Sequence, residues 1–84
     1  MMTIKEINSF PPTEKGVADF GARLKLLGLD FHLDDPPSQV VNARGERIFT
    51  TRQSEAIVGF LARSAAHLGW DSVWDAYAKT YDTN

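Results

Sequence analysis

The segment 39–49 carries the strongest local structural signal in the chain. Two stretches that contain β-branched residues, 39–42 and 46–49, flank the short sequence Ala43-Arg44-Gly45. Asn42 at the first position and Gly45 three residues later suit a type I turn followed by a residue with positive φ. Any fold for this chain must therefore accommodate an antiparallel hairpin near its middle. The pairs expected across it are Asn42 with Glu46, Val41 with Arg47, and Val40 with Ile48.

Three other segments repeat apolar residues at the three- and four-residue spacing of a helical face. We expect one helix after Thr13, an N-cap candidate, and another after Thr50, which forms a capping-box pattern with Gln53. A shorter helix is expected after Asp71, also an N-cap candidate. The apolar faces comprise Val17, Phe20, Leu24 and Leu27; Ile57, Phe60, Leu61, Ala65 and Leu68; and Val73, Trp74, Tyr77, Ala78 and Tyr81.

Two pairs of prolines divide the chain. Pro11 and Pro12 favour extended backbone before them, so residues 1–12 are predicted to form an extended N-terminal arm. Residues 13–84 are then expected to form a single α+β domain. Apolar and polar residues alternate from 29 to 34, which predicts a strand with one buried face, and the second proline pair ends it.

The predicted order is helix, strand, hairpin, helix, helix. This order favours a small two-layer α+β domain, with the helices packed on one face of a two- or three-stranded antiparallel sheet. The sequence leaves open whether the strand at 29–33 joins the hairpin. A mostly helical domain with the hairpin as a projecting wing is the alternative.

Composition excludes several classes of protein. The 84 residues include 9 basic and 11 acidic residues, for a net charge of −2, and no cysteine. A disulfide framework, a cysteine zinc site and a cysteine nucleophile are therefore absent, and a general polyanion binder is disfavoured. No stretch approaches the roughly 18 apolar residues of a membrane span, and residues 1–10 lack the apolar core of a signal peptide. We therefore expect a cytoplasmic protein.

One face of the predicted strand 29–34 carries candidate metal ligands. Asp30, His32 and Asp34 alternate along it, and carboxylate with imidazole suits a divalent cation. One strand supplies only a linear row of ligands, however, so we favour a solvated outer face and expect neither a metal nor another cofactor. The chain has no nucleophile elbow, Walker A sequence or zinc-protease motif, so we expect no enzymatic activity.

The junction between the last two predicted helices, within residues 54–81, loosely resembles a helix-turn-helix. A small DNA-binding regulator is therefore an alternative function. The second helix carries Asp71, Asp75 and Asp82 against a single basic residue, Lys79. Phosphate contacts require net positive charge, so a nucleic-acid partner is disfavoured.

Two groups of residues are candidates for contact with another protein. Arg44 and Arg47 lie at the hairpin, with Arg52 at the start of the following helix. Trp70, Trp74, Tyr77 and Tyr81 form one aromatic stripe, and tryptophan and tyrosine are enriched in protein interfaces. We expect the two tryptophans to dock mainly on the core, and the two tyrosines to lie closer to a partner.

The function that these patterns favour is a non-enzymatic protein-binding module. It would inhibit or modulate a larger protein by occupying part of its surface, as accessory proteins of phage or mobile elements do. The residues expected to bind the partner are Arg44, Arg47, Trp74, Tyr77 and Tyr81. Homodimerisation through the aromatic stripe is a close variant, and a metal-dependent role is a further alternative.

Overall fold

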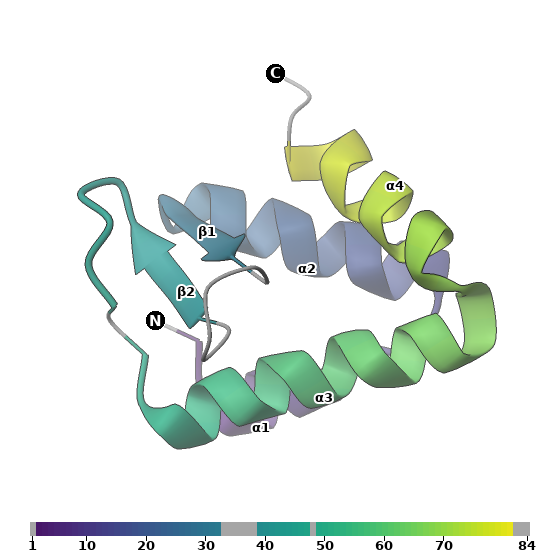
Figure 1. The fold of residues 1–84 in the computed structure, drawn as a ribbon, viewed down its shortest axis with the longest axis horizontal. Helices are drawn as coiled ribbons and strands as arrows, with labels where there is room; N and C mark the ends of the chain where they lie inside the picture. The colour runs from purple at the N-terminus through teal and green to yellow at the C-terminus, as the bar shows by residue number, and fades with distance from the viewer. Residues whose placement is uncertain (1, 33–38, 48, 82–84) are drawn as a thin grey trace.

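The computed structural model describes residues 2–32, 39–47 and 49–81. It is a mixed α+β domain with four helices and one two-stranded antiparallel sheet in the described chain (Figure 1). The elements, in chain order, are α1 (Ile4–Ser9), α2 (Glu14–Leu26), β1 (Leu29–His32), β2 (Gln39–Asn42), α3 (Thr51–Leu68) and α4 (Trp70–Tyr81).

The sheet pairs β1 with β2, which answers the question that the sequence left open. The two strands run antiparallel, with Phe31 opposite Val40 and Asp30 opposite Val41. Beyond β2 the predicted turn is confirmed. The Asn42 N–H donates to the Glu46 carbonyl at 3.1 Å, and Gly45 has a φ of 77°.

The second arm of the hairpin forms one isolated bridge among the described residues, Val41 with Arg47. This is one of the pairs that the sequence predicts. The expected pairing of Val40 with Ile48 falls on a residue outside those that the structure describes.

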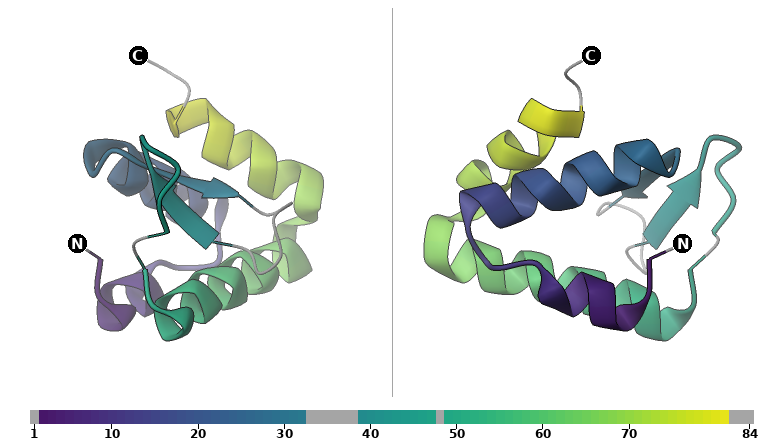
Figure 2. Two further views of the ribbon diagram at one scale, coloured as in Figure 1. Left: turned by 60° about the vertical axis from the view of Figure 1, so that its left-hand side comes forward. Right: turned by 180° about the vertical axis from the view of Figure 1, so that it is seen from behind.

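The prediction that residues 1–12 form an extended arm is wrong. Ile4–Ser9 form α1, with the Thr3 hydroxyl accepting from the Glu6 N–H at 3.1 Å. A proline restricts the residue directly before it, which here is Phe10, and leaves a helix that ends at Ser9 free to form. Packing of α1 beside α3 then buries Ile7, and the Gln53 amide donates to the Met2 carbonyl at 3.1 Å (Figure 2, right).

The ends of α2 and α3 follow the sequence signals. The Thr13 hydroxyl caps α2, accepting from the Gly16 N–H at 3.0 Å. Thr50 and Gln53 form the full capping box at the start of α3. Helix α4, however, begins at Trp70 rather than after Asp71, because the Gly69 carbonyl accepts from the Val73 N–H at 3.1 Å.

The hydrophobic core lies where α2, α3 and α4 meet. The rings of Phe20 and Phe60 lie 5.4 Å apart, and Phe10 contacts both. Helix α4 packs against α2 and α3, and β1 packs against α2 (Figure 1). The largest fully buried side chains are Met2, Ile7, Val17, Phe20, Leu24, Val40, Ile57, Phe60, Leu61 and Val73.

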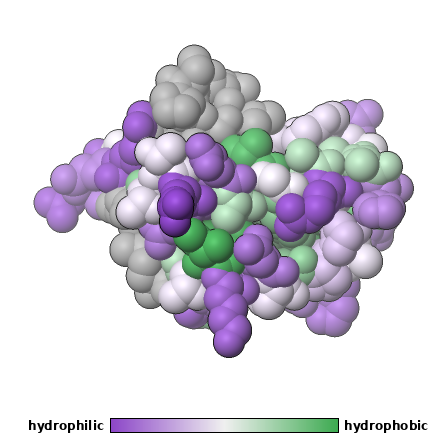
Figure 3. All heavy atoms as spheres, turned by 90° about the horizontal axis from the view of Figure 1, so that it is seen from below, coloured by the Kyte–Doolittle hydropathy of each residue, from purple (hydrophilic) through white to green (hydrophobic). Residues whose placement is uncertain are grey.

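The surface seen from below in Figure 1 offers no broad apolar area. Small hydrophobic patches are separated there by hydrophilic side chains (Figure 3). Within the described residues, no helix has the length and hydrophobicity needed to cross a bilayer. A candidate binding surface is therefore to be sought among individual exposed apolar residues on other faces.

Candidate partner-binding surface

The start of α4 exposes an aromatic pair at the corner where α3 turns into α4. Trp70 is 43% exposed, and its ring stacks on that of Trp74, with centroids 5.7 Å apart and planes 21° apart. Asp71 and Asp75 are exposed beside them. We call Trp70, Asp71, Trp74 and Asp75 the corner surface.

The corner exists because a single residue separates the two helices. Gly69 has a φ of 86°, a backbone conformation that favours glycine, and its N–H donates to the Ala65 carbonyl at 2.7 Å. The chain therefore changes direction sharply between Leu68 and Trp70. Trp70 projects at this bend, beyond the packed part of α4, while Val73 one turn later is fully buried.

The structure reverses the expected burial of Trp70 and Tyr77. The sequence places Trp70 mainly on the core and Tyr77 closer to a partner, but Tyr77 is only 9% exposed. Its ring contacts Phe20 and Trp74, and its hydroxyl donates to an Asp30 carboxylate oxygen at 3.0 Å. The stripe of four aromatic residues is continuous, but the core covers its middle and not its beginning.

Of the other two aromatic candidates, Trp74 and Tyr81, the structure describes the side chain of Trp74 only. Trp74 is half-buried and packs against the core through one edge, so it links the buried part of α4 to the exposed Trp70. The side chain of Tyr81 lies outside the described residues. Its expected contact with a partner stays a prediction.

The acidic residues of the corner surface have no ion pair among the described residues. Glu6 pairs with Arg23 at 2.8 Å, Asp19 with Lys15 at 2.9 Å and Glu46 with Arg44 at 3.3 Å, whereas Asp71 and Asp75, like Glu14 and Glu55, have none there. The corner surface thus combines an exposed aromatic ring with two exposed carboxylates.

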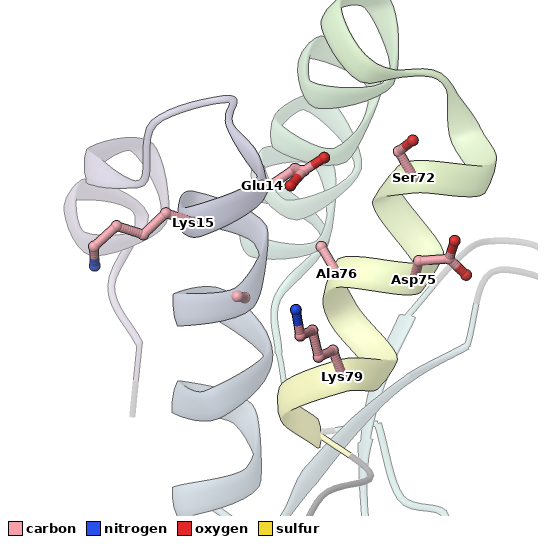
Figure 4. Close-up of a pocket in the computed structure, with 7 residues that line it drawn as sticks. Glu14, Lys15, Ser72, Asp75, Ala76 and Lys79 are labelled. Carbon is pink, nitrogen blue, oxygen red and sulfur yellow. The ribbon is translucent and has the colours of Figure 1, made fainter.

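An open groove of about 620 Å³ adjoins the corner surface, between the start of α2 and the exposed side of α4. Ala18 and Ala76 line it, while Lys79 points toward α2 (Figure 4). Lys15 and Asp75 point outward from opposite walls (Figure 4). These two charged groups diverge, so they do not form an acid–base pair. Its lining residues are Glu14, Lys15, Ala18, Ser72, Asp75, Ala76 and Lys79.

The hairpin arginines lie at the opposite end of the molecule from Trp70. Figures 1 and 2 place the turn after β2 on one side and the start of α4 on the other. Arg44 and Arg47 are exposed as expected, and Arg44 pairs with Glu46. The Asn42 side chain also accepts from the N–H groups of Arg44 and Glu46. The hairpin arginines therefore lie apart from Trp70, and a surface that joins them to Trp74, Tyr77 and Tyr81 stays a prediction.

The candidate metal ligands are described only in part. Asp30 accepts the Tyr77 hydrogen bond, whereas the side chain of His32 and all of Asp34 lie outside the described residues. Among the residues described, no three histidine or acidic side chains gather into a possible metal site. Asp30 therefore has a structural partner on α4, the hydroxyl of Tyr77.

The α3–α4 junction has a shorter turn than a helix-turn-helix usually has. That motif joins its helices by a turn of three or four residues, and here one glycine, Gly69, separates them. The exposed side of the second helix also carries Asp71 and Asp75, which repel phosphate.

No family model, curated protein or solved structure matches this chain. A function for this chain is therefore inferred from its own residues.

Trp70 was not expected at the surface, although two signals in the sequence mark it. It follows a glycine that ends a helix, and it stands three residues before Val73, the first buried position of the next.

Proposed function

We propose that this protein is a non-enzymatic protein-binding module that modulates a larger protein by occupying part of its surface. The observation that carries the proposal is the exposed Trp70, whose ring stacks on the half-buried Trp74. Tryptophan is the residue most often found at the energetic centre of protein interfaces, where burial of its large ring displaces water. A ring that is 43% exposed in the free protein is available for such burial.

The stacking of the two rings supports this proposal. Trp74 is anchored against the core and fixes the position of Trp70, so little side-chain freedom remains to be lost when a partner binds. Leu26, although 80% exposed, has no comparable aromatic neighbour and lies at the end of α2. A pre-positioned aromatic pair is therefore the better contact, while a single exposed leucine is ordinary.

The proposal retains two predictions from the sequence. The first is a cytoplasmic accessory protein of the phage or mobile-element type. The second is the finer architecture, in which residues 46–49 add a third strand and the helices cover one face of the sheet. In that arrangement the sheet and hairpin support the helical layer and leave the start of α4 for the partner.

The test is capture of partners from a lysate of the encoding organism, with nuclease present. The wild-type protein and Leu26→Ala are expected to retain a stoichiometric protein partner that Trp70→Ala loses. Leu26→Ala is the matched control because it also removes an exposed apolar side chain. Equal retention by all three proteins would refute the role of Trp70. Capture of nucleic acid without protein would support the DNA-binding alternative, and a Trp70-dependent homodimer in sedimentation would assign the surface to self-association.

A further inference from the structure

We infer that the corner surface binds an arginine-rich segment of a partner protein. This inference rests on the proposed function and specifies the chemistry of the partner. It follows from the position of Asp71 and Asp75, which have no ion pair among the described residues, beside the exposed Trp70.

The spacing of the four residues gives two parallel rows along α4. Residues four apart lie one above the other on a helix, so Trp70 and Trp74 form an aromatic row. Asp71 and Asp75 form the adjacent row, about 100° around the helix axis. A chain segment that lies along the start of α4 would therefore meet the outer face of the Trp70 ring and the carboxylates of Asp71 and Asp75.

Both rows favour a cation. The face of the Trp70 ring that does not stack on Trp74 attracts a cation through its negative quadrupole, and the carboxylates of Asp71 and Asp75 add negative charge beside it. Asp75 also lines the neighbouring groove, where Glu14 and Lys15 carry opposite charges. Lys79 lies one turn beyond Asp75 at the far end of the acidic row, and its side chain points toward α2 (Figure 4).

Arginine fits this arrangement better than lysine. Its planar guanidinium stacks on an aromatic face while its N–H groups donate two parallel hydrogen bonds to a carboxylate. A lysine ammonium is a compact, strongly hydrated charge and cannot make both contacts in one plane.

The shape and charge of the surface point to a segment of protein as the occupant. The corner surface is a helix face and not an enclosed cavity, so a small free cation would gain few contacts. A nucleic acid could stack its bases on the rings, but Asp71 and Asp75 would repel its phosphates. A peptide with several arginines satisfies both rows together.

The test is a fluorescence titration of the purified full-length protein. Trp70 and Trp74 are the two tryptophans of the chain, so intrinsic tryptophan emission reports directly on the corner surface. The probes are hexa-arginine, hexa-lysine and hexa-glutamate peptides with blocked ends. We expect a saturable change in emission with hexa-arginine, a weaker one with hexa-lysine and none with hexa-glutamate.

Variants separate the corner surface from general charge attraction. Asp71→Asn with Asp75→Asn is expected to raise the Kd for hexa-arginine at least about fivefold, and Trp70→Ala about fivefold. Glu55→Gln is the matched control, because it removes an exposed acid from α3 and is expected to leave the Kd unchanged. Circular dichroism of each variant verifies that the fold is retained.

Two results would overturn the inference. One is the absence of a saturable change with hexa-arginine, and the other is a Kd that the double aspartate variant and Glu55→Gln change equally. Neither result bears on the lysate experiment. If Trp70→Ala loses a partner there, the proposed function is supported even where the arginine inference fails. Conversely, hexa-arginine binding together with a partner retained by Trp70→Ala would preserve the surface chemistry and refute the proposed function.

Discussion

Trp70 and Tyr77 stand two turns apart on one helix and have opposite environments. Tyr77 is 9% exposed, contacts Phe20 and donates a hydrogen bond to Asp30, whereas Trp70 is 43% exposed beside Asp71. The same class of side chain therefore stabilises the fold at one position and is left available at the other. The difference shows that an aromatic stripe becomes a binding surface only where the core stops covering it.

The largest expected loss of stability comes from replacing the buried residue of the pair, Tyr77. Tyr77→Ala should lower the free energy of unfolding by about 3 kcal/mol, because it leaves a cavity beside Phe20 and removes the partner of Asp30. Urea denaturation followed by circular dichroism measures the change. A loss no greater than that of Trp70→Ala would show that Tyr77 is not part of the core.

The second largest loss of stability is expected from a substitution at Gly69, the bend that precedes α4. Gly69→Ala should lower the free energy of unfolding by about 2 kcal/mol, because an alanine is strained at a φ of 86° and ψ of 149°. Gly59→Ala is the control. It lies inside α3 without positive φ, and its added Cβ would meet only the flexible end of Arg63, at 3.4 Å. This control should be neutral or slightly stabilising, and equal losses in the two variants would contradict the role assigned to Gly69.

The hydrogen bond between α4 and β1 can be removed without a cavity. Tyr77→Phe deletes the hydroxyl that donates to Asp30 at 3.0 Å and should lower the free energy of unfolding by about 1.5 kcal/mol. Thermal and urea unfolding of this variant, compared with Tyr77→Ala, separate the hydrogen bond from ring burial. An unchanged stability would mean that water replaces the hydroxyl at no net loss.

The smallest expected loss of stability comes from replacing the exposed residue of the pair, Trp70. Trp70→Ala should lower the free energy of unfolding by only about 1 kcal/mol, since the residue is 43% exposed and its stacking partner Trp74 is itself only half-buried. The same urea titration provides the measurement. A loss approaching that of Tyr77→Ala would make Trp70 a structural residue and remove the basis for the corner surface.

Local signals allowed part of this fold to be predicted. The turn from Asn42 to Gly45 and the capping box of Thr50 and Gln53 depend on residues within four positions of one another, and both are present. The pairing of Val41 with Arg47 follows directly from the turn. Such features need no knowledge of how distant segments pack.

The errors arose where distant packing decides the outcome. Helix α1 has six residues, too few to be stable alone, and it is buried against α3, more than 40 residues away. The periodicity of α4 identified its apolar face but not where along the helix the core ends. That limit is set by the one-residue bend at Gly69 and by the contact of α4 with α2.

The central claim is that Trp70 contacts another protein, and the most direct measurement is site-specific photo-crosslinking in the encoding cells. A photoreactive phenylalanine analogue replaces Trp70 in one variant and, in the other, the control residue Leu26, which is 80% exposed against 43% for Trp70. The account predicts a discrete crosslinked protein at position 70 that is absent at position 26. No crosslinked protein at position 70, or the same products at both positions, would contradict it.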